Sequence, residues 1–289
     1  SVRRCDYGGK LNEQSSCFIF LDELGIVCGI ILYFDGLKLK SLPAEFIPYN
    51  HLLIFPGLKY GTERSLAAEK YLIRYLAEKY GHFEYISNPK NRDVRSALFL
   101  EHDNERISVS VKLRYTASLN LRNRSNIEEI RLNYKVRRRR WIKKARALGY
   151  GVSNSYDTDE LKAMYVSTFE RQNIEVSTKS LLKLEGIVEY AHKNNGYVVM
   201  VRDSNGEASS AAVCLTDLHT AYSILILNQK SKIYDGCSSL CMDAAIDRAL
   251  RLDLSQFDFV GANSPGRGDF KLSFGADLIP YFHLGVTFA

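Results

Sequence analysis

The sequence lacks any apolar run that is long enough to cross a membrane. Its longest such run, residues 26–34, has nine residues, whereas a spanning helix needs roughly 20. We therefore expect no integral membrane segment. The sequence also lacks the P-loop pattern GxxxxGK(S/T), a strand followed by GxGxxG, the GxSxG elbow and the HExxH helix. Phosphate binding or hydrolysis by any of these standard devices is therefore excluded.

Cysteine and histidine offer no convincing metal site. The six cysteines include no CxxC pair, and the six histidines are scattered along the chain. Cys237 and Cys241 lie four residues apart on an expected helix, but a zinc site needs more ligands, and His219 stands alone nearby. We predict reduced cysteines, no metal and a cytoplasmic protein.

Charge and composition are ordinary for a folded chain with a core of its own. Lys and Arg number 39 against 33 Asp and Glu, a net charge of +6, and 46% of the residues are apolar. A length of 289 residues predicts about two domains. The mild basic excess fits an anionic ligand, and we expect no DNA partner.

Hydrophobic periodicity and turn residues divide the chain into two similar halves around a helical middle. In the first half we expect strands at 17–22, 26–34, 83–86 and 106–115 and helices at 63–80 and 91–100. In the second half we expect a hairpin at 197–202 and 208–215, strands at 221–227, 257–260 and 279–286, and helices at 238–252 and 268–274. The repeated order predicts a duplicated α/β fold with a mixed sheet and helices on its faces. We place the domains at residues 1–122 and 123–289.

The middle of the chain carries an unusual concentration of positive charge. We expect one long helix over residues 126–148, and its segment 131–146 has nine basic residues and no acidic one. The apolar stripe from Tyr134 to Trp141 passes through Arg137 or Arg138, so an arginine must face the protein. Such a guanidinium needs a partner inside the protein or an anion in a cleft. Phosphate binding, an RNA contact and a solvated surface helix all remain open.

Two loops that precede helices are candidate ligand sites. Residues 257–275 form a strand, a Gly- and Pro-rich loop and a short helix that carries Lys271. Ligands favour the carboxyl ends of such strands. Residues 228–236 lead into another helix and contain Lys230, Lys232 and Gly236, where free backbone amides can hold phosphate oxygens. Both segments also fit plain strand-to-helix connections.

Three segments carry a family resemblance. They are Arg114-Tyr115-Thr116-x-x-Leu119-Asn120-Leu121, Ile142-Lys143-Lys144-Ala145 and the spacing FDFxGAxxPGxxxFKxxFG over residues 257–275. Together they resemble the Fem-like branch of the GNAT acyltransferases, which includes the FemAB peptidoglycan aminoacyltransferases. The resemblance implies two tandem GNAT-like domains, the second beginning with the basic helix, and Lys271 near the reacting or phosphate groups. Many relatives have FEGS where this chain has Phe259-Val260-Gly261-Ala262, so that glutamate is missing here.

The resemblance implies an N-acyltransferase that moves an acyl or aminoacyl group from acyl-CoA to an amine of a cell-envelope precursor or amino sugar. Cell-wall or polysaccharide biosynthesis would be its setting, with a small-molecule, lipid-linked or nucleotide-sugar acceptor as partner. One alternative is a peptidoglycan aminoacyltransferase that uses aminoacyl-tRNA as donor. The other is a non-catalytic ligand-binding protein on a GNAT scaffold.

The residues that we expect to act fall into two groups. Lys271 would contact an oxyanion or phosphate, and Asn263 would hydrogen-bond the acceptor or the reacting carbonyl. Tyr222 and Tyr281 are the candidate proton donors. The expected substrate- and phosphate-binding residues are Arg138, Arg139, Lys144, Arg114, Lys230, Lys232 and Gly236.

Overall fold

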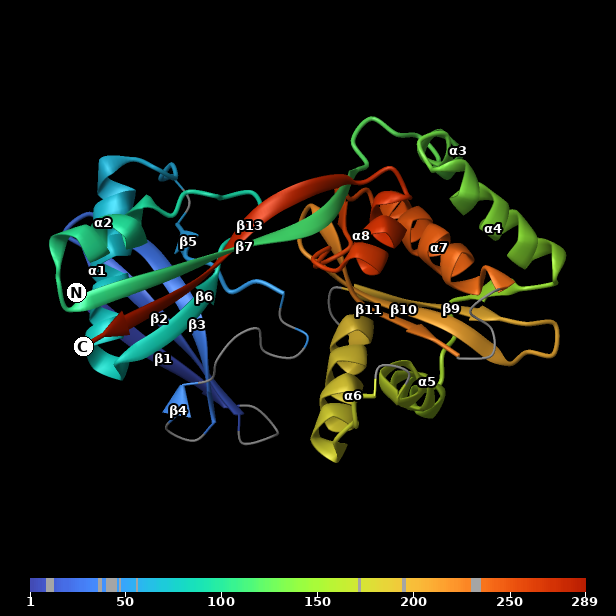
Figure 1. The fold of residues 1–289 in the computed structure, drawn as a ribbon, viewed down its shortest axis with the longest axis horizontal. Helices are drawn as coiled ribbons and strands as arrows, with labels where there is room; N and C mark the ends of the chain where they lie inside the picture. Colours follow the sequence, from blue (N-terminus) through green and yellow to red (C-terminus); the bar gives the residue numbers. More distant parts are fainter. Residues whose placement is uncertain are drawn as a thin grey trace. The chain divides into compact units, whose positions relative to one another are not determined.

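The computed structural model describes residues 1–8, 13–35, 38–39, 46, 48–55, 57–170, 173–193, 196–229 and 235–289. Its contacts divide the chain into two compact units (Figure 1). Unit 1 comprises Ser1–Tyr115 and Ile279–Ala289, and unit 2 comprises Thr116–Leu278. This division lies seven residues before the expected boundary after residue 122, and the last strand returns to unit 1. Among the described residues, no helix has the length and apolar character to cross a membrane.

Unit 1 contains a five-stranded sheet, two helices, the further strand β6 and parts of two other strands. Its elements are β1 (Val2–Gly8), β2 (Glu13–Asp22), β3 (Gly25–Asp35), β4 (Lys38–Leu39), β5 (Leu53–Ile54), α1 (Glu63–Tyr80), β6 (His82–Ile86), α2 (Arg95–Asp103) and portions of β7 (Ile107–Asn120) and β13 (Asp277–Phe288). The first sheet has the order β1-β2-β3-β4, with β5 also paired to β3. β6 pairs antiparallel with β13.

Helix α1 supplies one wall of the unit 1 core. It begins where the Thr62 hydroxyl accepts a hydrogen bond from the Ser65 backbone N–H, and it ends at Gly81, whose φ is 71°. Both limits were predicted, because a threonine cap and a terminal glycine are strong local signals. Apolar residues of α1 at intervals of three or four, such as Leu72 and Leu76, pack against the β2–β3 hairpin and β6. The amphipathic pattern thus places the helix on the sheet.

Glu69 of α1 makes the stability of unit 1 depend on pH. Its carboxylate is buried, accepts a hydrogen bond from Ser96 Oγ at 2.8 Å, and has a pKa that burial raises to about 7. Between about pH 5 and about pH 8 the folded state therefore holds the proton more tightly than the unfolded state. We expect the free energy of unfolding to fall by about 3 kcal/mol over this rise in pH. Urea unfolding at both ends of the range would measure it.

The matched variants for this prediction are Glu69→Gln and Glu63→Gln. Glutamine at position 69 cannot ionise, so the loss of stability with rising pH should disappear. Glu63 lies exposed in the first turn of the same helix, and its replacement should leave the wild-type pH dependence in place. Equal pH dependence in the wild type and Glu69→Gln would show that the buried carboxyl does not cause it.

Unit 2 is built on one mixed sheet with helices on both faces. Its elements are α3 (Ile127–Arg131), α4 (Val136–Ala147), β8 (Gly151–Ser153), α5 (Thr158–Glu170), α6 (Thr178–Lys193), β9 (Gly196–Arg202), β10 (Ala208–Thr216), β11 (Thr220–Asn228), α7 (Cys237–Arg251), β12 (Gln256–Asp258) and α8 (Pro265–Leu272). The strand order in this unit is β7-β12-β11-β10-β9-β8. Figure 1 shows α5 and α6 on one face of the sheet and α7 with α4 on the other.

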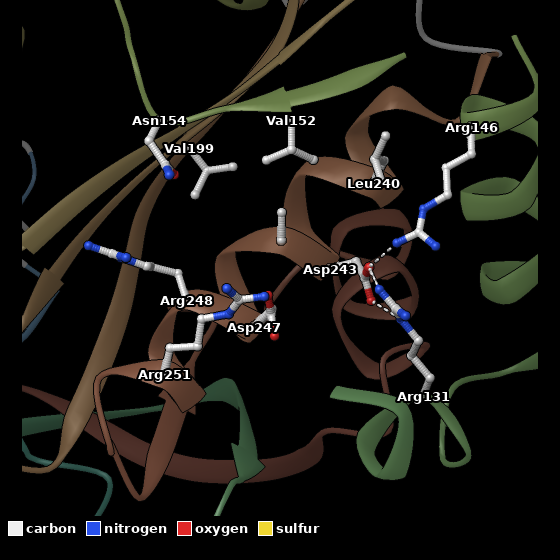
Figure 2. A pocket seen from close by; sticks show the side chains of 11 residues that line it. Arg131, Arg146, Val152, Asn154, Val199, Leu240, Asp243, Asp247, Arg248 and Arg251 are labelled. Atoms are coloured by element: carbon white, nitrogen blue, oxygen red, sulfur yellow. Dashed lines mark hydrogen bonds and ion pairs between the residues drawn. The ribbon is translucent and has the colours of Figure 1, made fainter. Parts of the chain in front are cut away.

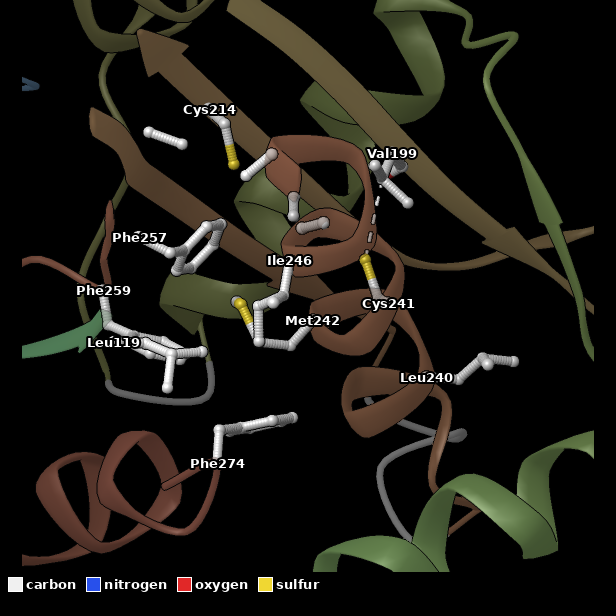
Figure 3. Packing of buried hydrophobic residues seen from close by; sticks show 14 of the residues in the cluster. Leu119, Val199, Cys214, Leu240, Cys241, Met242, Ile246, Phe257, Phe259 and Phe274 are labelled. Carbon is white, nitrogen blue, oxygen red and sulfur yellow. Dashed lines mark hydrogen bonds between the residues drawn. The ribbon is translucent and has the colours of Figure 1, made fainter. Parts of the chain in front are cut away.

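The core of unit 2 lies between the sheet and α7 (Figure 3). Cys241, Met242 and Ile246 of α7 are fully buried and lie among side chains of the strands, such as Val199. Cys214, Cys237 and Cys241 are buried, as is Cys28 of unit 1, and Cys17 of unit 1 is partly buried. The side chain of Cys5 lies outside the described residues. These cysteines act as small apolar residues of the core.

The two halves repeat the same order of elements, which confirms the predicted duplication. In unit 1 the hairpin β2–β3 is followed, after the two-residue strands β4 and β5, by α1, β6, α2 and β7. In unit 2 the hairpin β10–β11 is followed by α7, β12, α8 and β13. The last strand of each series also pairs with the short strand of the other series, β7 with β12 and β13 with β6. β11 and β12 run parallel, whereas β12 with β7, β11 with β10, β10 with β9 and β9 with β8 are antiparallel, so the sheet is mixed as expected.

The prediction of one continuous helix over residues 126–148 was wrong. α3 and α4 are separated by an elbow at residues 132–135, where the backbone N–H of Lys135 donates to the carbonyl of Ser273 at 2.9 Å. Gly275, with a φ of 77°, allows this approach, because a Cβ there would lie 2.9 Å from the Asn133 carbonyl oxygen. The helix is broken by contacts with a distant segment, and such contacts cannot be predicted from the hydrophobic periodicity of residues 126–148.

Candidate functional site

β11 and β12 separate soon after they meet. They pair in parallel only from Thr220 and Gln256 to Tyr222 and Asp258, where β12 ends, while β11 continues to Asn228. Over residues 223–228, β11 pairs with β10 on its other side, and no described strand covers the edge that faces β12. Unpaired backbone groups at such an edge can bind an extended ligand.

The chain leaves β12 through a strained turn. Val260 and Gly261 have positive φ values of 53° and 52°. For a valine this conformation costs on the order of 1–2 kcal/mol. The buried carboxylate of Asp258 holds the turn, because it accepts hydrogen bonds from the Val260 backbone N–H at 2.7 Å and from Thr116 Oγ1 at 2.6 Å. Strain that the surroundings hold in place is typical of functional sites.

Lys271 of α8 reaches into this turn. Its ammonium donates to the carbonyl of Val260 and, at 2.6 Å, to that of Gly261. Lys271 is only 9% exposed, and burial lowers its pKa to about 8, although attraction to Asp258 opposes the shift. An ammonium has three N–H donors, and these two bonds engage two of them. Lys271 can therefore hold the turn and still donate to a ligand oxygen.

Arg138 is the arginine of the basic segment that faces the protein, as expected. It is 4% exposed, and it donates to Ser273 Oγ at 2.9 Å and to Ser239 Oγ at 2.6 Å. Its guanidinium carbon lies 4.3 Å from the ring centre of Phe270 and 4.9 Å from that of Phe274. Burial lowers its pKa to about 10. Among the described residues no carboxylate forms an ion pair with it; hydroxyls and aromatic rings contact the guanidinium, and Asp269 attracts it without an ion-pair contact.

The first turn of α7 lies against α4. Gly236 has a φ of 85°, and a Cβ there would lie 2.2 Å from the carbonyl oxygen of Trp141. The Lys144 ammonium lies 5.1 Å from the Trp141 ring centre and 4.0 Å from Asp235 Oδ1. Gly236 is thus required by packing, whatever else it does. Two of the predicted residues, Lys230 and Lys232, lie outside the described residues.

The other predicted residues of unit 2 have local partners. Arg139 donates to the Leu132 carbonyl at 3.1 Å and so closes the end of α3. Tyr222 donates to Asp217 Oδ2 at 2.7 Å, and burial together with this bond raises its pKa far above the usual value. Asn263 is exposed in the loop between β12 and α8. A proton-donor role for Tyr222 would require it to leave Asp217.

Two predicted residues belong to unit 1. Tyr281 of β13 is buried and packs edge-on against Tyr49, with ring centres 5.3 Å apart. Arg114 is half-buried on β7. Within unit 2, by contrast, two predicted residues meet at α8. Lys271 belongs to this helix, and the Arg138 guanidinium packs on Phe270, the residue before Lys271.

Sequence reasoning missed the groups that support Lys271. Asp258 and Thr116 lie on different strands, 142 residues apart in the sequence, and only the position of Asp258 at a strand end could have singled it out. Ser239, which accepts from Arg138, likewise carries no sequence signal. Among the described residues, no group of three or more His, Cys, Asp or Glu could hold a metal ion.

Two hollows of unit 2 are lined by charged side chains. The α5 pocket, of about 840 Å³, is lined by Glu160, Ala163, Met164, Ser167, Glu207, Ala208 and Gln229. The α7 pocket, of about 240 Å³, contains four arginines and two aspartates (Figure 2). In it the buried Asp243 accepts hydrogen bonds from Arg131 and lies 3.7 Å from the Arg146 guanidinium. The α5 pocket lies at the end of β11, the strand whose edge is open.

Comparison with known proteins identifies the fold. No family model matches the chain, and no curated protein matches its sequence. Among solved structures, FemX aligns with a TM-score of 0.63 and 15% identity over 93% of this chain and 87% of FemX. A tandem GNAT protein from the clavulanic acid biosynthesis pathway aligns with a TM-score of 0.56 and 9% identity over 96% of this chain and 83% of that one.

A third solved structure supports the same assignment. L-PGS from Bacillus licheniformis aligns with a TM-score of 0.56 and 11% identity over 93% of this chain and 83% of L-PGS. Similarity at such low identity establishes the arrangement of the chain and leaves the reaction to be argued from the site. The chain therefore has the duplicated mixed α/β fold of FemX and the tandem GNAT proteins, as its sequence motifs predicted.

Proposed function

We propose that this chain is an N-acyltransferase that moves an acyl or aminoacyl group from acyl-CoA to an amine of a cell-envelope precursor or an amino sugar. The observation that carries the proposal is Lys271. Its ammonium is buried at the carboxyl end of β12, where β11 and β12 separate, and it keeps one donor for a ligand. Fixed donors in a water-poor site are the main source of stabilisation for a developing oxyanion.

The proposed reaction needs little more than positioning and charge. The acceptor amine attacks the thioester carbonyl, a C–N bond forms and the C–S bond breaks. The proton that the amine loses ends on the departing thiolate, directly or through water. Lys271 would donate to the carbonyl oxygen while that oxygen carries negative charge. Because the protein has Val260 where many relatives have glutamate, the proton would leave by another route.

Charges near the first turn of α7 support a phosphorylated donor. Arg138 lies beneath this turn through its bond to Ser239, and it has no carboxylate partner among the described residues. Lys144 lies beside Asp235, just before the helix. The amino end of α7, a helix of 15 residues, adds the partial positive charge of its free amides. We propose that donor phosphates bind here.

The α5 pocket is our proposed acceptor site. It lies at the Asn228 end of β11, about 20 Å along the strand from the position that pairs with Asp258, and includes two carboxylates, which would attract a cationic group of the acceptor that is remote from its reacting amine. Glu160 is already engaged by the Arg202 guanidinium at 2.7 and 2.8 Å. Glu207 is exposed, and only its backbone takes part in the described hydrogen bonds. Glu207 is therefore the carboxylate that is available to an acceptor.

Two other functions compete with this proposal. The basic surface of α4 would suit an aminoacyl-tRNA donor, whose binding should weaken steeply with salt because many phosphates are contacted. A donor affinity that stays constant between low and moderate salt would reject that alternative. The absence of a carboxylate from residues 259–262 favours the second alternative, a ligand-binding protein without catalysis.

A thiol-release assay with panels of acyl-CoA donors and amine acceptors tests the proposed function. We expect free thiol to appear only when both a donor and an amino sugar or wall-precursor amine are present. Reactions without amine and without protein are the controls. If no combination of donor and acceptor releases thiol while donors still raise the melting temperature of the protein, the chain binds its ligands without catalysis.

A further inference from the structure

The basic segment presents an exposed face that the proposed reaction does not use. At the elbow between α3 and α4, Leu132 is 76% exposed, and Val136 at the start of α4 is 54% exposed. Two large exposed apolar side chains four residues apart are unusual in a segment that is otherwise strongly charged. They lie at the end of α3 and the beginning of α4, and neither belongs to the core of unit 2.

Three cations share this face with the two apolar residues. Arg139 and Arg140 follow Val136 by three and four residues, and Lys143 follows them by four and three, so all four lie on one side of α4. The opposite side, which includes Arg138 and Ile142, is buried. We call Leu132, Val136, Arg139, Arg140 and Lys143 the elbow face. Among the described residues, Arg140 and Lys143 form no ion pair and no side-chain hydrogen bond.

A hollow of about 520 Å³ borders the elbow face on the side of Leu132, Arg139 and Lys143, and its lining includes neither Val136 nor Arg140. Leu132 and Ile142 line it together with Arg139, Lys143 and Arg146. Acidic residues of α3 also border it, but Glu128 pairs with Arg131, and Glu129 accepts hydrogen bonds at the amino end of α3. The cations on the α4 side are therefore the charges that remain for a partner.

We propose that the elbow face binds the surface of an anionic lipid bilayer, with Leu132 and Val136 in the interface and Arg139, Arg140 and Lys143 on lipid phosphates. Apolar side chains flanked by lysine and arginine are the arrangement that membrane interfaces favour. An RNA backbone would use the cations alone and would gain nothing from two exposed aliphatic residues. The combination of both kinds of residue on one face therefore favours lipid.

Flotation of the full chain with vesicles tests this proposal. We expect binding to phosphatidylcholine vesicles that contain about 30% phosphatidylglycerol and no binding to pure phosphatidylcholine. Raising sodium chloride from about 0.1 M to about 0.5 M should weaken the binding strongly. Because flotation needs no turnover, its result is independent of the acyl-transfer assay, and either can fail alone.

Two variants separate the contributions of charge and apolar contact. Arg140→Gln with Lys143→Gln should weaken binding about 30-fold, and Leu132→Ser should weaken it about 10-fold. Lys59→Gln with Arg92→Gln removes the same charge from exposed positions of unit 1, and Leu218→Ser replaces a leucine that is 90% exposed in the β10–β11 turn. Both control variants should bind as the wild type does.

Three results would overturn the proposal. They are equal binding to both kinds of vesicle, wild-type binding by the Arg140/Lys143 variant, and wild-type binding by Leu132→Ser. A short RNA duplex serves as the competing probe. If it binds with a steep salt dependence that Leu132→Ser does not change, while vesicles do not bind, the elbow face is an RNA surface. Circular dichroism melting curves establish that each variant is folded.

Discussion

Replacing Lys271 with alanine should lower turnover on the true substrate by about 100-fold. The ammonium is the buried donor at the end of β12, and its loss removes the charge that would stabilise the oxyanion. We expect the loss in kcat rather than in KM, since the bond to the carbonyl oxygen strengthens as charge develops. Steady-state thiol release on the purified variant would measure it. Unchanged turnover would remove Lys271 from the mechanism.

The pH profile distinguishes a chemical role of Lys271 from a structural one. Its pKa is lowered to about 8 by burial, so the donating form is lost as the pH rises through that value. Wild-type turnover should fall above about pH 8, and the residual activity of Lys271→Ala should lack this decline. Lys135→Ala is the matched control, because Lys135 is exposed and pairs with Asp269 of the same helix α8. It should keep wild-type turnover.

Local signals predicted elements well where the chain supplies its own caps. The limits of α1 follow from Thr62 and Gly81, and the β9–β10 hairpin follows from the turn Asp203-Ser204-Asn205-Gly206. The start of α8 was missed by three residues, although Pro265 in its first turn is a recognised helix start. The α3–α4 break was missed for a different reason, because Ser273 and Gly275 impose it from a distance.

The candidate site was predictable only in part. Lys271 was found through its motif, and Arg138 was found because an arginine interrupts an apolar stripe. The hydrogen-bond partners around them could not be predicted, because these bonds join separate elements. Thr116 donates to Asp258, and Arg138 donates to Ser239 and Ser273. Residue roles can be inferred from local patterns, whereas partnerships across the fold require the structure.

Replacing Gly236 with alanine should lower the free energy of unfolding by about 3–5 kcal/mol. The residue has a φ of 85°, and the added Cβ would lie 2.2 Å from the Trp141 carbonyl oxygen and 2.9 Å from its carbon. Both atoms are backbone of α4, so relief requires α4 and α7 to move apart. Urea unfolding of unit 2, followed by the fluorescence of the single tryptophan, Trp141, would measure the loss.

Gly206→Ala is the matched control for this prediction. Gly206 has a φ of 83° in the β9–β10 turn, but nothing lies within 4 Å of the position where its Cβ would be. Its replacement carries only the conformational penalty, about 1–2 kcal/mol. The difference between the two variants therefore measures the close approach of α7 to α4. Equal losses would show that the contact with Trp141 yields easily, and would leave Gly236 free to serve a ligand rather than the packing of these helices.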